Sequence, residues 1–165
     1  MKDLKKPGKN LMKPPETYVK KIQSKDSGHN QSVIDNIRTI ASIKHPLIPK
    51  IIAVDETHYE MEYIHGRTVA SIYWNIEEEK RKELIFNFVS QVSTLINVMF
   101  KLKNNSYPDH LFIGKDMRTL SNYMMDKTGR MVCLDFDSWR WYPNKKAIWH
   151  ARNVISFQIE RLLTS

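Results

Sequence analysis

The segment 79–103 has the strongest periodic pattern in this sequence, and it limits the folds that the chain can adopt. Apolar side chains recur there at helical spacing and fall on one face: Leu84, Phe88, Val92, Leu95, Ile96, Met99 and Leu102. Charged and amide residues such as Lys80, Asn87 and Gln91 lie off this stripe. The pattern predicts a long amphipathic helix that must bury one face against the rest of the protein.

Shorter patterns predict the elements around this helix. Three segments with β-branched and aromatic residues are predicted strands: 17–23, 50–55 and 59–64. Two segments with apolar residues at helical spacing are predicted helices: 32–44, which starts at Ser32 and ends before His45-Pro46, and about 146–163. Residues 1–15 are rich in lysine and interrupted by prolines, so they are predicted to form a basic, flexible lead-in.

A β-hairpin is predicted between the long helix and the last one. Segments 122–126 and 130–136 have the pattern of two strands, and the residues from Asp126 to Gly129 form the turn between them. Gly129 suits a turn position that requires a positive φ angle. The order of strands, helices and hairpin predicts an α+β fold, and 165 residues correspond to a single domain over 16–165.

The net charge of +8 calls for a partner with negative charge. A nucleotide triphosphate or an acidic protein would satisfy it. Nucleic acid is the less favoured partner, because no zinc-finger spacing and no surface of alternating basic and aromatic residues is visible in the sequence. A basic nucleic-acid-binding domain therefore stays a distant alternative.

The only cysteine, Cys133, lies within the apolar run MVCL. It is predicted to be a buried thiol, and a single cysteine excludes an intramolecular disulfide. No apolar run reaches the roughly 20 residues of a membrane span, and the first residues lack the apolar core of a signal peptide. A cytoplasmic protein without membrane contact is expected.

Two segments have motifs that belong together. The segment HPLIPKIIAVDETHYEMEYIHGRTV (45–69) has a helix-ending His-Pro and a strand that leads into Met-Glu-Tyr-Ile-His-Gly. The segment GKDMRTLSNYMMDKTGRMVCLDFDSW (114–139) has Asp116 in a loop, Asn122 before the hairpin and Asp135 after it. In this order they resemble the protein-kinase-like superfamily of protein kinases and aminoglycoside phosphotransferases. The small size resembles a minimal, truncated member of viral or phage type, which would act in the host cytoplasm.

The resemblance implies a reduced protein-kinase-like fold and roles for residues in the first segment. Residues 16–66 would form a reduced N-terminal lobe with a small antiparallel sheet and a helix. Residues 67–165 would form a truncated, mostly helical C-terminal lobe with a catalytic hairpin. Met61 takes the gatekeeper position, and the residues after it would form the hinge whose backbone hydrogen-bonds adenine: Glu62, Tyr63 and Ile64.

The second segment supplies the residues for phosphoryl transfer, a reaction that depends on positioning and on neutralising phosphate charge. Asp135 and Asn122 would hold Mg²⁺, which prefers oxygen ligands. Asp116 would accept or orient the proton of the attacking hydroxyl. In the strand TYVKKI, Lys20 matches the lysine that pairs with the phosphates of ATP, and Lys21 is the spare.

The chain departs from the family pattern at several positions. A glycine-rich phosphate loop is missing before Lys20, and Asn36 stands where a glutamate would hold that lysine, with Asp35 one residue away. Gly114 replaces the histidine of the catalytic loop, and the spacing from Asp116 to Asn122 is one residue longer. Asp109 is a competing candidate for the catalytic aspartate.

The expected activity is that of an ATP-dependent phosphotransferase, a minimal Ser/Thr protein kinase that uses Mg²⁺-ATP and acts on a protein. The alternative is a pseudokinase that serves as a nucleotide-binding or protein-interaction module. The missing glycine-rich loop and Asn36 favour the alternative, whereas the presence of Asp116, Asn122 and Asp135 together favours the enzyme.

Overall fold

The computed structural model describes residues 16–22 and 27–164, and the side chains of residues 27–30 are left out. The predicted lead-in 1–15 lies outside the described residues. In chain order the elements are β1 (Thr17–Lys21), α1 (Ser27–Ala41), β2 (Ile51–Val54), β3 (His58–Glu62), β4 (Gly66–Thr68), α2 (Val69–Trp74), α3 (Glu78–Phe100), β5 (His110–Gly114), the 3₁₀ turn η1 (Leu120–Asn122), β6 (Tyr123–Asp126), β7 (Met131–Cys133), β8 (Trp139–Pro143) and α4 (Asn144–Thr164).

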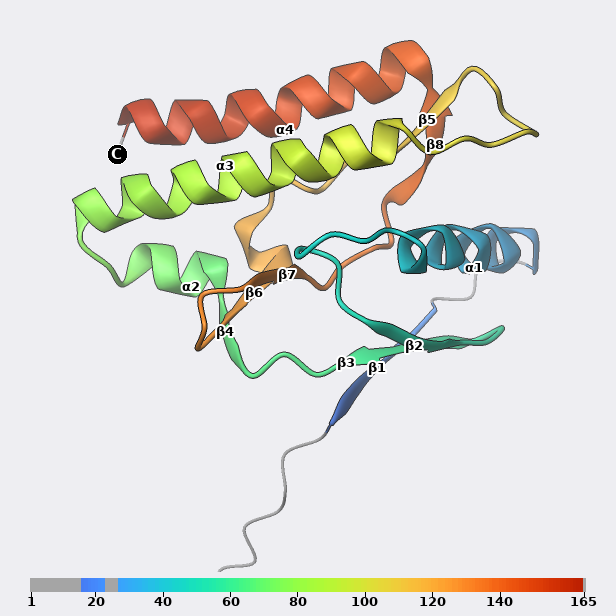
Figure 1. The fold of residues 1–165 in the computed structure, drawn as a ribbon, viewed down its shortest axis with the longest axis horizontal. Helices are drawn as coiled ribbons and strands as arrows, with labels where there is room; N and C mark the ends of the chain where they lie inside the picture. The colour runs from blue at the N-terminus through green and yellow to red at the C-terminus, as the bar shows by residue number, and fades with distance from the viewer. Residues whose placement is uncertain (1–15, 23–26, 165) are drawn as a thin grey trace, which may run out of the picture.

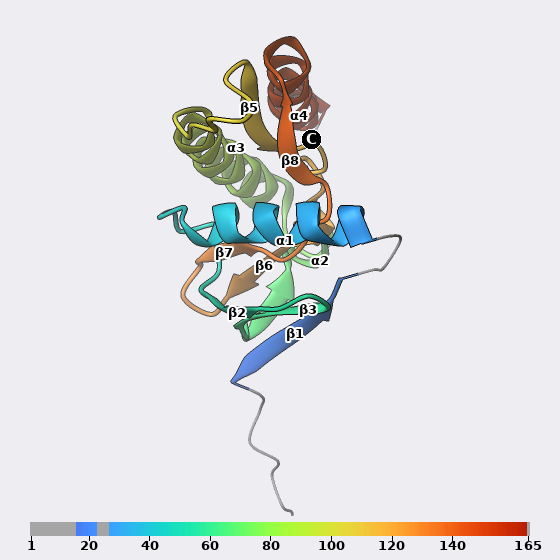
Figure 2. The ribbon, with the colours of Figure 1, turned by 90° about the vertical axis from the view of Figure 1, so that its right-hand side faces the viewer.

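The predicted α+β fold with small antiparallel sheets is confirmed. One sheet has the strand order β1-β3-β2, a second has the order β4-β6-β7, and β5 pairs with β8. Every described strand pair is antiparallel. Figure 2 shows α1 between the sheet of β1, β2 and β3 and the layer that contains β5, β8, α3 and α4.

The long helix is present as α3, and its predicted stripe is buried apart from Leu102, which lies beyond the end of the helix and is partly buried. Its buried side chains are Leu84, Ile85, Phe88, Val92, Leu95, Ile96 and Met99. Figure 1 shows α3 and α4 running side by side, and β5 packs against both helices. By length and composition α3 is the one described helix that meets the requirements of a membrane span, a test that a buried core helix also passes. Its stripe packs within one continuous core that extends from Ile22 to Val154, so we assign it to the core.

The hairpin forms as predicted, with shorter strands. β6 and β7 pair from Tyr123↔Cys133 to Met125↔Met131, and Gly129 has a φ of 84° in the turn. Asn122, predicted as the first strand residue, lies instead at the end of η1. Cys133 is buried as predicted, and this burial raises its pKa to about 12.

The first helix and several short strands differ from the prediction. The helix predicted over 32–44 is α1, which begins at Ser27 and ends at Ala41. The sequence patterns did not predict β4, α2, β5 or β8. The pairing partners of these strands lie far along the chain, as for β5 with β8, so no local pattern predicts them.

Candidate functional site

Lys20 of β1 meets two carboxylates from the other end of the chain. Its Nζ donates a hydrogen bond of 2.9 Å to Oδ1 of Asp135, a residue 115 positions further along. The same ammonium lies 3.3 Å from Oδ1 of Asp137. The side chain of Lys20 is 23% exposed and that of Asp135 42% exposed. The structure thus joins the predicted phosphate lysine to the predicted metal-binding aspartate.

The alternation of side chains along β1 explains why Lys20, and not Lys21, contacts the two aspartates. Successive side chains of a strand point to opposite faces of the sheet. Lys20 stands opposite Tyr59 in the pairing with β3 and is half-buried, whereas Lys21 is exposed. Asp35, considered as a partner for Lys20, bonds Gln31 and Arg38 on α1 instead. Asp35 is therefore wrong as the holding carboxylate.

The charges around Lys20 outweigh its burial. Burial alone would lower the pKa of this ammonium, but the hydrogen bond and the charge of Asp135, together with Asp137, raise it above its ordinary value. The neighbouring Tyr59 is buried, and its hydroxyl has no hydrogen-bond partner among the described residues. Burial and the two aspartates raise the pKa of Tyr59. With its raised pKa, Lys20 carries a positive charge at neutral pH.

The hairpin holds Asn122 close to the segment of Asp135. The Leu134 N–H donates 2.8 Å to the Asn122 carbonyl, which ties the start of β6 to the residue before Asp135. Nδ2 of Asn122 donates to the backbone carbonyl of Asp116, at 3.5 Å. With that amide nitrogen directed to Asp116, Oδ1 of Asn122 is the remaining acceptor. The predicted residues Asp116, Asn122 and Asp135 therefore lie along one connected path.

Asp116 lies in the loop that follows β5, and its residue is exposed. Its backbone N–H donates 3.3 Å to Oγ of the buried Ser138, so the loop is anchored to the segment after Asp137. The competing Asp109 precedes β5, and its carbonyl accepts from the N–H of Asn144. The strand between them spans roughly 17 Å at about 3.3 Å per residue, so Asp109 lies at the end of β5 away from Asn122.

Gly114 is the residue that the packing at this position requires. It pairs with Trp139 across β5 and β8, and a Cβ at this position would collide with the Trp139 indole. Trp139 is fully buried and stacks edge-on against Phe136 with 5.2 Å between ring centroids. The indole therefore fills the space that a larger side chain at Gly114 would need.

The predicted hinge lies at the end of β3, where two of its backbone N–H groups already have hydrogen-bond partners within the protein. Met61 and Ile64 are buried, and Tyr63 is partly exposed. The N–H groups of Glu62 and Tyr63 donate to the carbonyls of Lys50 and Glu16, at 2.9 and 3.2 Å. These two N–H groups are therefore not available to an adenine edge in this structure.

The Glu62 side chain has a structural partner. Its Oε1 accepts 2.8 Å from Nη2 of Arg130, in the hairpin turn region, and 2.9 Å from the Lys50 N–H. Partial burial would raise the pKa of this carboxyl, but the bonds from Arg130 and Lys50 lower it. This ion pair joins β3 to the second sheet.

The donors at this site fit a hard cation that keeps part of its water shell. Among the described residues no group of three or more His, Cys, Asp or Glu side chains is clustered as a metal site. Mg²⁺ needs less, because it is held by one or two protein oxygens together with water and phosphates. Asp135 and the Oδ1 of Asn122 are the residues that would hold it. Asp137 is a third oxygen donor nearby. It was not among the predicted metal ligands, although it follows Asp135 by two residues in the sequence Asp-Phe-Asp.

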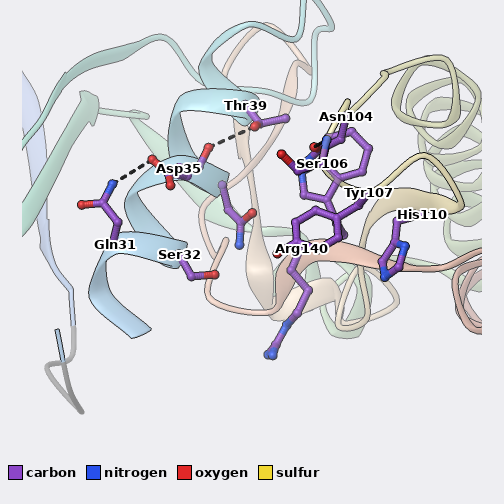
Figure 3. Close-up of a pocket in the computed structure, with 11 residues that line it drawn as sticks. Gln31, Ser32, Asp35, Thr39, Asn104, Ser106, Tyr107, His110 and Arg140 are labelled. Carbon is purple, nitrogen blue, oxygen red and sulfur yellow. Dashed lines mark hydrogen bonds between the residues drawn. The ribbon is translucent and has the colours of Figure 1, made fainter. Parts of the chain in front are cut away.

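Two cavities near α1 and Asp116 were not predicted. One of about 740 Å³ lies between α1, the loop before β5, and β8; its labelled lining residues in Figure 3 include Asn104, His110 and Arg140. Asn36, which the resemblance placed where a glutamate would hold Lys20, also lines this cavity. A smaller cavity of about 270 Å³ contains Asp116. His150 lines it and is buried.

Comparison with protein-family models gives no match, and a search of curated proteins gives none either.

Proposed function

We propose that this protein is an ATP-dependent phosphotransferase with a reduced protein-kinase-like fold, which transfers phosphate from Mg²⁺-ATP to a Ser/Thr hydroxyl. The observation that supports it most is the contact of Lys20 with Asp135 across 115 positions. Protein kinases need a strand lysine at the phosphates and an aspartate on Mg²⁺ at the same place. A lysine–aspartate pair of this kind would bring both to one triphosphate.

Nucleotide binding would rearrange this ion pair. Mg²⁺ bound between Asp135 and Oδ1 of Asn122 would compete with Lys20 for the Asp135 carboxylate. Lys20 would then turn to the phosphate oxygens, where an ammonium acts as a point charge on a flexible stem. Asp137 would keep Lys20 nearby while the exchange takes place, because it lies 3.3 Å from the same Nζ.

Asp116 would act on the acceptor. Its loop is fixed by Ser138 and Asn122, which sets the distance from the carboxylate to the metal-binding residues. The acceptor oxygen forms a bond to the γ-phosphorus while the bond from phosphorus to the bridging oxygen of ADP breaks. The hydroxyl proton passes to the Asp116 carboxylate and then to solvent. This is positioning and proton acceptance, the small covalent contribution that phosphoryl transfer requires.

A pseudokinase is the second candidate, and the hinge favours it. The N–H groups of Glu62 and Tyr63 are bonded within the protein, so an adenine ring would depend on the carbonyls of the hinge and on Ile64. Weak adenine contacts predict a low nucleotide affinity. A pseudokinase would bind Mg²⁺-ATP without transferring phosphate. An enzyme would transfer phosphate, and a change of Asp116 would abolish the transfer while Mg²⁺-ATP binding is kept.

Calorimetric titration of Lys20→Met and Lys21→Met with Mg²⁺-ATP tests the nucleotide site. Lys20→Met should weaken binding about tenfold or more, because a charged hydrogen bond contributes about 1.5–3 kcal/mol. Lys21→Met removes the same charge from an exposed position and should leave the affinity nearly unchanged. Equal effects of the two changes would contradict the assignment of Lys20 to the phosphates.

A further inference from the structure

A small cavity beside Asp116 has the chemistry of a binding site for an anion. It has a volume of about 270 Å³, and its lining residues come from the loop after β5 and from α4: Lys115, Asp116, Arg118, Trp149, His150 and Asn153. Helix α4 packs against β5, so the loop and the helix form two walls of one site. No part of the sequence pattern pointed to this meeting of residues 115–118 with residues 149–153.

Cations outnumber the single carboxylate of this cavity. Lys115 and Arg118 lie on either side of Asp116 in the chain, and both line the cavity. Lys146, one turn earlier on α4, adds a third positive charge; burial lowers the pKa of His150, and the charges of Lys146 and Lys115 lower it further. At physiological salt, charges interact over about 8 Å, so these groups act together on a ligand inside the cavity.

The wall around Arg118 is fixed. Its guanidinium lies over the Phe157 ring, 5.1 Å from the centroid. Its backbone carbonyl accepts a hydrogen bond of 2.5 Å from Nε2 of Gln158, a residue buried on α4. A cation held by stacking and by its own backbone loses less freedom when it binds an anion.

His150 gives an independent sign of a ligand. The residue is only 8% exposed, and its Nε2 is buried without a hydrogen-bond partner among the described residues. Its ring packs against Tyr142 and Trp149, at 4.7 and 5.1 Å between centroids. Buried polar atoms in folded proteins almost always have a partner, so a group from outside the chain is a candidate for this one.

We propose that this cavity binds an acidic side chain of the protein acceptor, next to the hydroxyl that Asp116 orients. The inference rests on the proposed phosphotransferase function and names its substrate class: a Ser/Thr segment with a neighbouring Glu or Asp. Pockets for whole small ligands measure about 300–1,000 Å³, so a cavity of about 270 Å³ suits one side chain of a longer segment. Trp149, 59% exposed at the cavity, offers an apolar contact to the rest of that segment.

Two serine peptides of equal length, one flanked by glutamates and one by lysines, test the proposal. Binding is measured by fluorescence anisotropy without nucleotide, and phosphate transfer is measured with radiolabelled Mg²⁺-ATP. The Glu-flanked peptide should bind at least about tenfold more tightly and be the better acceptor. The combined variant Lys115→Glu with Arg118→Glu should reverse the preference toward the Lys-flanked peptide, a gain that a misfolded protein cannot produce.

A matched control changes the same number of charges elsewhere. Lys44→Glu with Lys127→Glu lies on exposed positions outside this cavity and should keep the preference for the Glu-flanked peptide. Equal binding of both peptides to the wild-type protein, or a loss of preference in the control variant as large as in the cavity variant, would overturn the inference. Preferential binding without any Mg²⁺-ATP binding would refute the proposed function and leave the acidic-segment site in place.

Discussion

Asp135→Asn is the change that separates the two roles of this carboxylate. The substitution keeps the size of the side chain and removes its charge. Without nucleotide, Lys20 loses its bond of 2.9 Å and keeps Asp137 at 3.3 Å. A partly solvated pair of this kind contributes about 0.5–1 kcal/mol to the free energy of unfolding. The midpoint of thermal unfolding should therefore fall by only about 1–4 °C for a protein of this size.

The larger effect of Asp135→Asn should appear with Mg²⁺-ATP. At a ligand concentration one hundred times the dissociation constant, mass action stabilises the wild-type protein by about 2.7 kcal/mol. This corresponds to a rise of about 5–10 °C in the unfolding midpoint. If the variant binds about one hundredfold more weakly, the same concentration stabilises it by only about 0.4 kcal/mol, or roughly 1 °C.

Thermal unfolding by circular dichroism, with and without Mg²⁺-ATP, measures both effects. Asp137→Asn is the comparison variant, because it removes only the longer contact of Lys20 and should reduce the nucleotide shift less than Asp135→Asn does. A double-mutant cycle of Asp135→Asn with Lys20→Met isolates the coupling of the pair. Absence of any shift in the wild-type protein at millimolar nucleotide would refute the nucleotide site. A full shift in Asp135→Asn would refute its role at the metal.

Three more changes have defined outcomes. Asp116→Ala should reduce phosphate transfer by orders of magnitude and leave Mg²⁺-ATP binding nearly intact, while Asp109→Ala should change neither; radiolabelled transfer and calorimetry measure this, and the opposite result would exchange the two aspartates. Gly114→Ala should lower the free energy of unfolding by about 1–3 kcal/mol in urea titrations, because its Cβ collides with the indole of Trp139; an unchanged midpoint would disprove the packing argument. The carboxyl of Glu62 has a pKa below its ordinary value, so its stabilisation is present above its unfolded-state pKa and is lost as the pH falls through the folded-state value; Glu62→Gln should flatten this part of the acid unfolding curve, and an identical curve would contradict it.

The long elements could be predicted from the sequence because their signals are local. The stripe from Leu84 to Met99 predicted a helix over 79–103, and α3 covers Glu78–Phe100. The last helix was predicted over about 146–163 and extends over Asn144–Thr164. Gly129 marked the hairpin turn because its positive φ angle is a property of one residue. The short strands β5 and β8 have no such signal, since each depends on the other for its hydrogen bonds.

For the site, the sequence supplied residue types and their order, and the tertiary structure supplied their neighbours. Lys20, Asn122 and Asp135 were named from motifs, but no motif identified Asp135 as the partner of Lys20, and Asp35 was considered instead. Folding brings β1 to the segment after β7, and only this brings an ammonium within 2.9 Å of a carboxylate 115 positions away. The half-burial that makes the pair specific follows from the same packing.

The cavity beside Asp116 shows the difference most clearly. The basic character of the chain was evident from its charge of +8, and Asp116 was a candidate from its motif. The burial of His150 was not predicted, because a local pattern does not reveal which face of a helix a distant strand will cover. The packing of α4 against β5 buried its ring and placed it beside Lys115. Charge and residue type are properties of the sequence, whereas burial and proximity arise only when distant segments pack together.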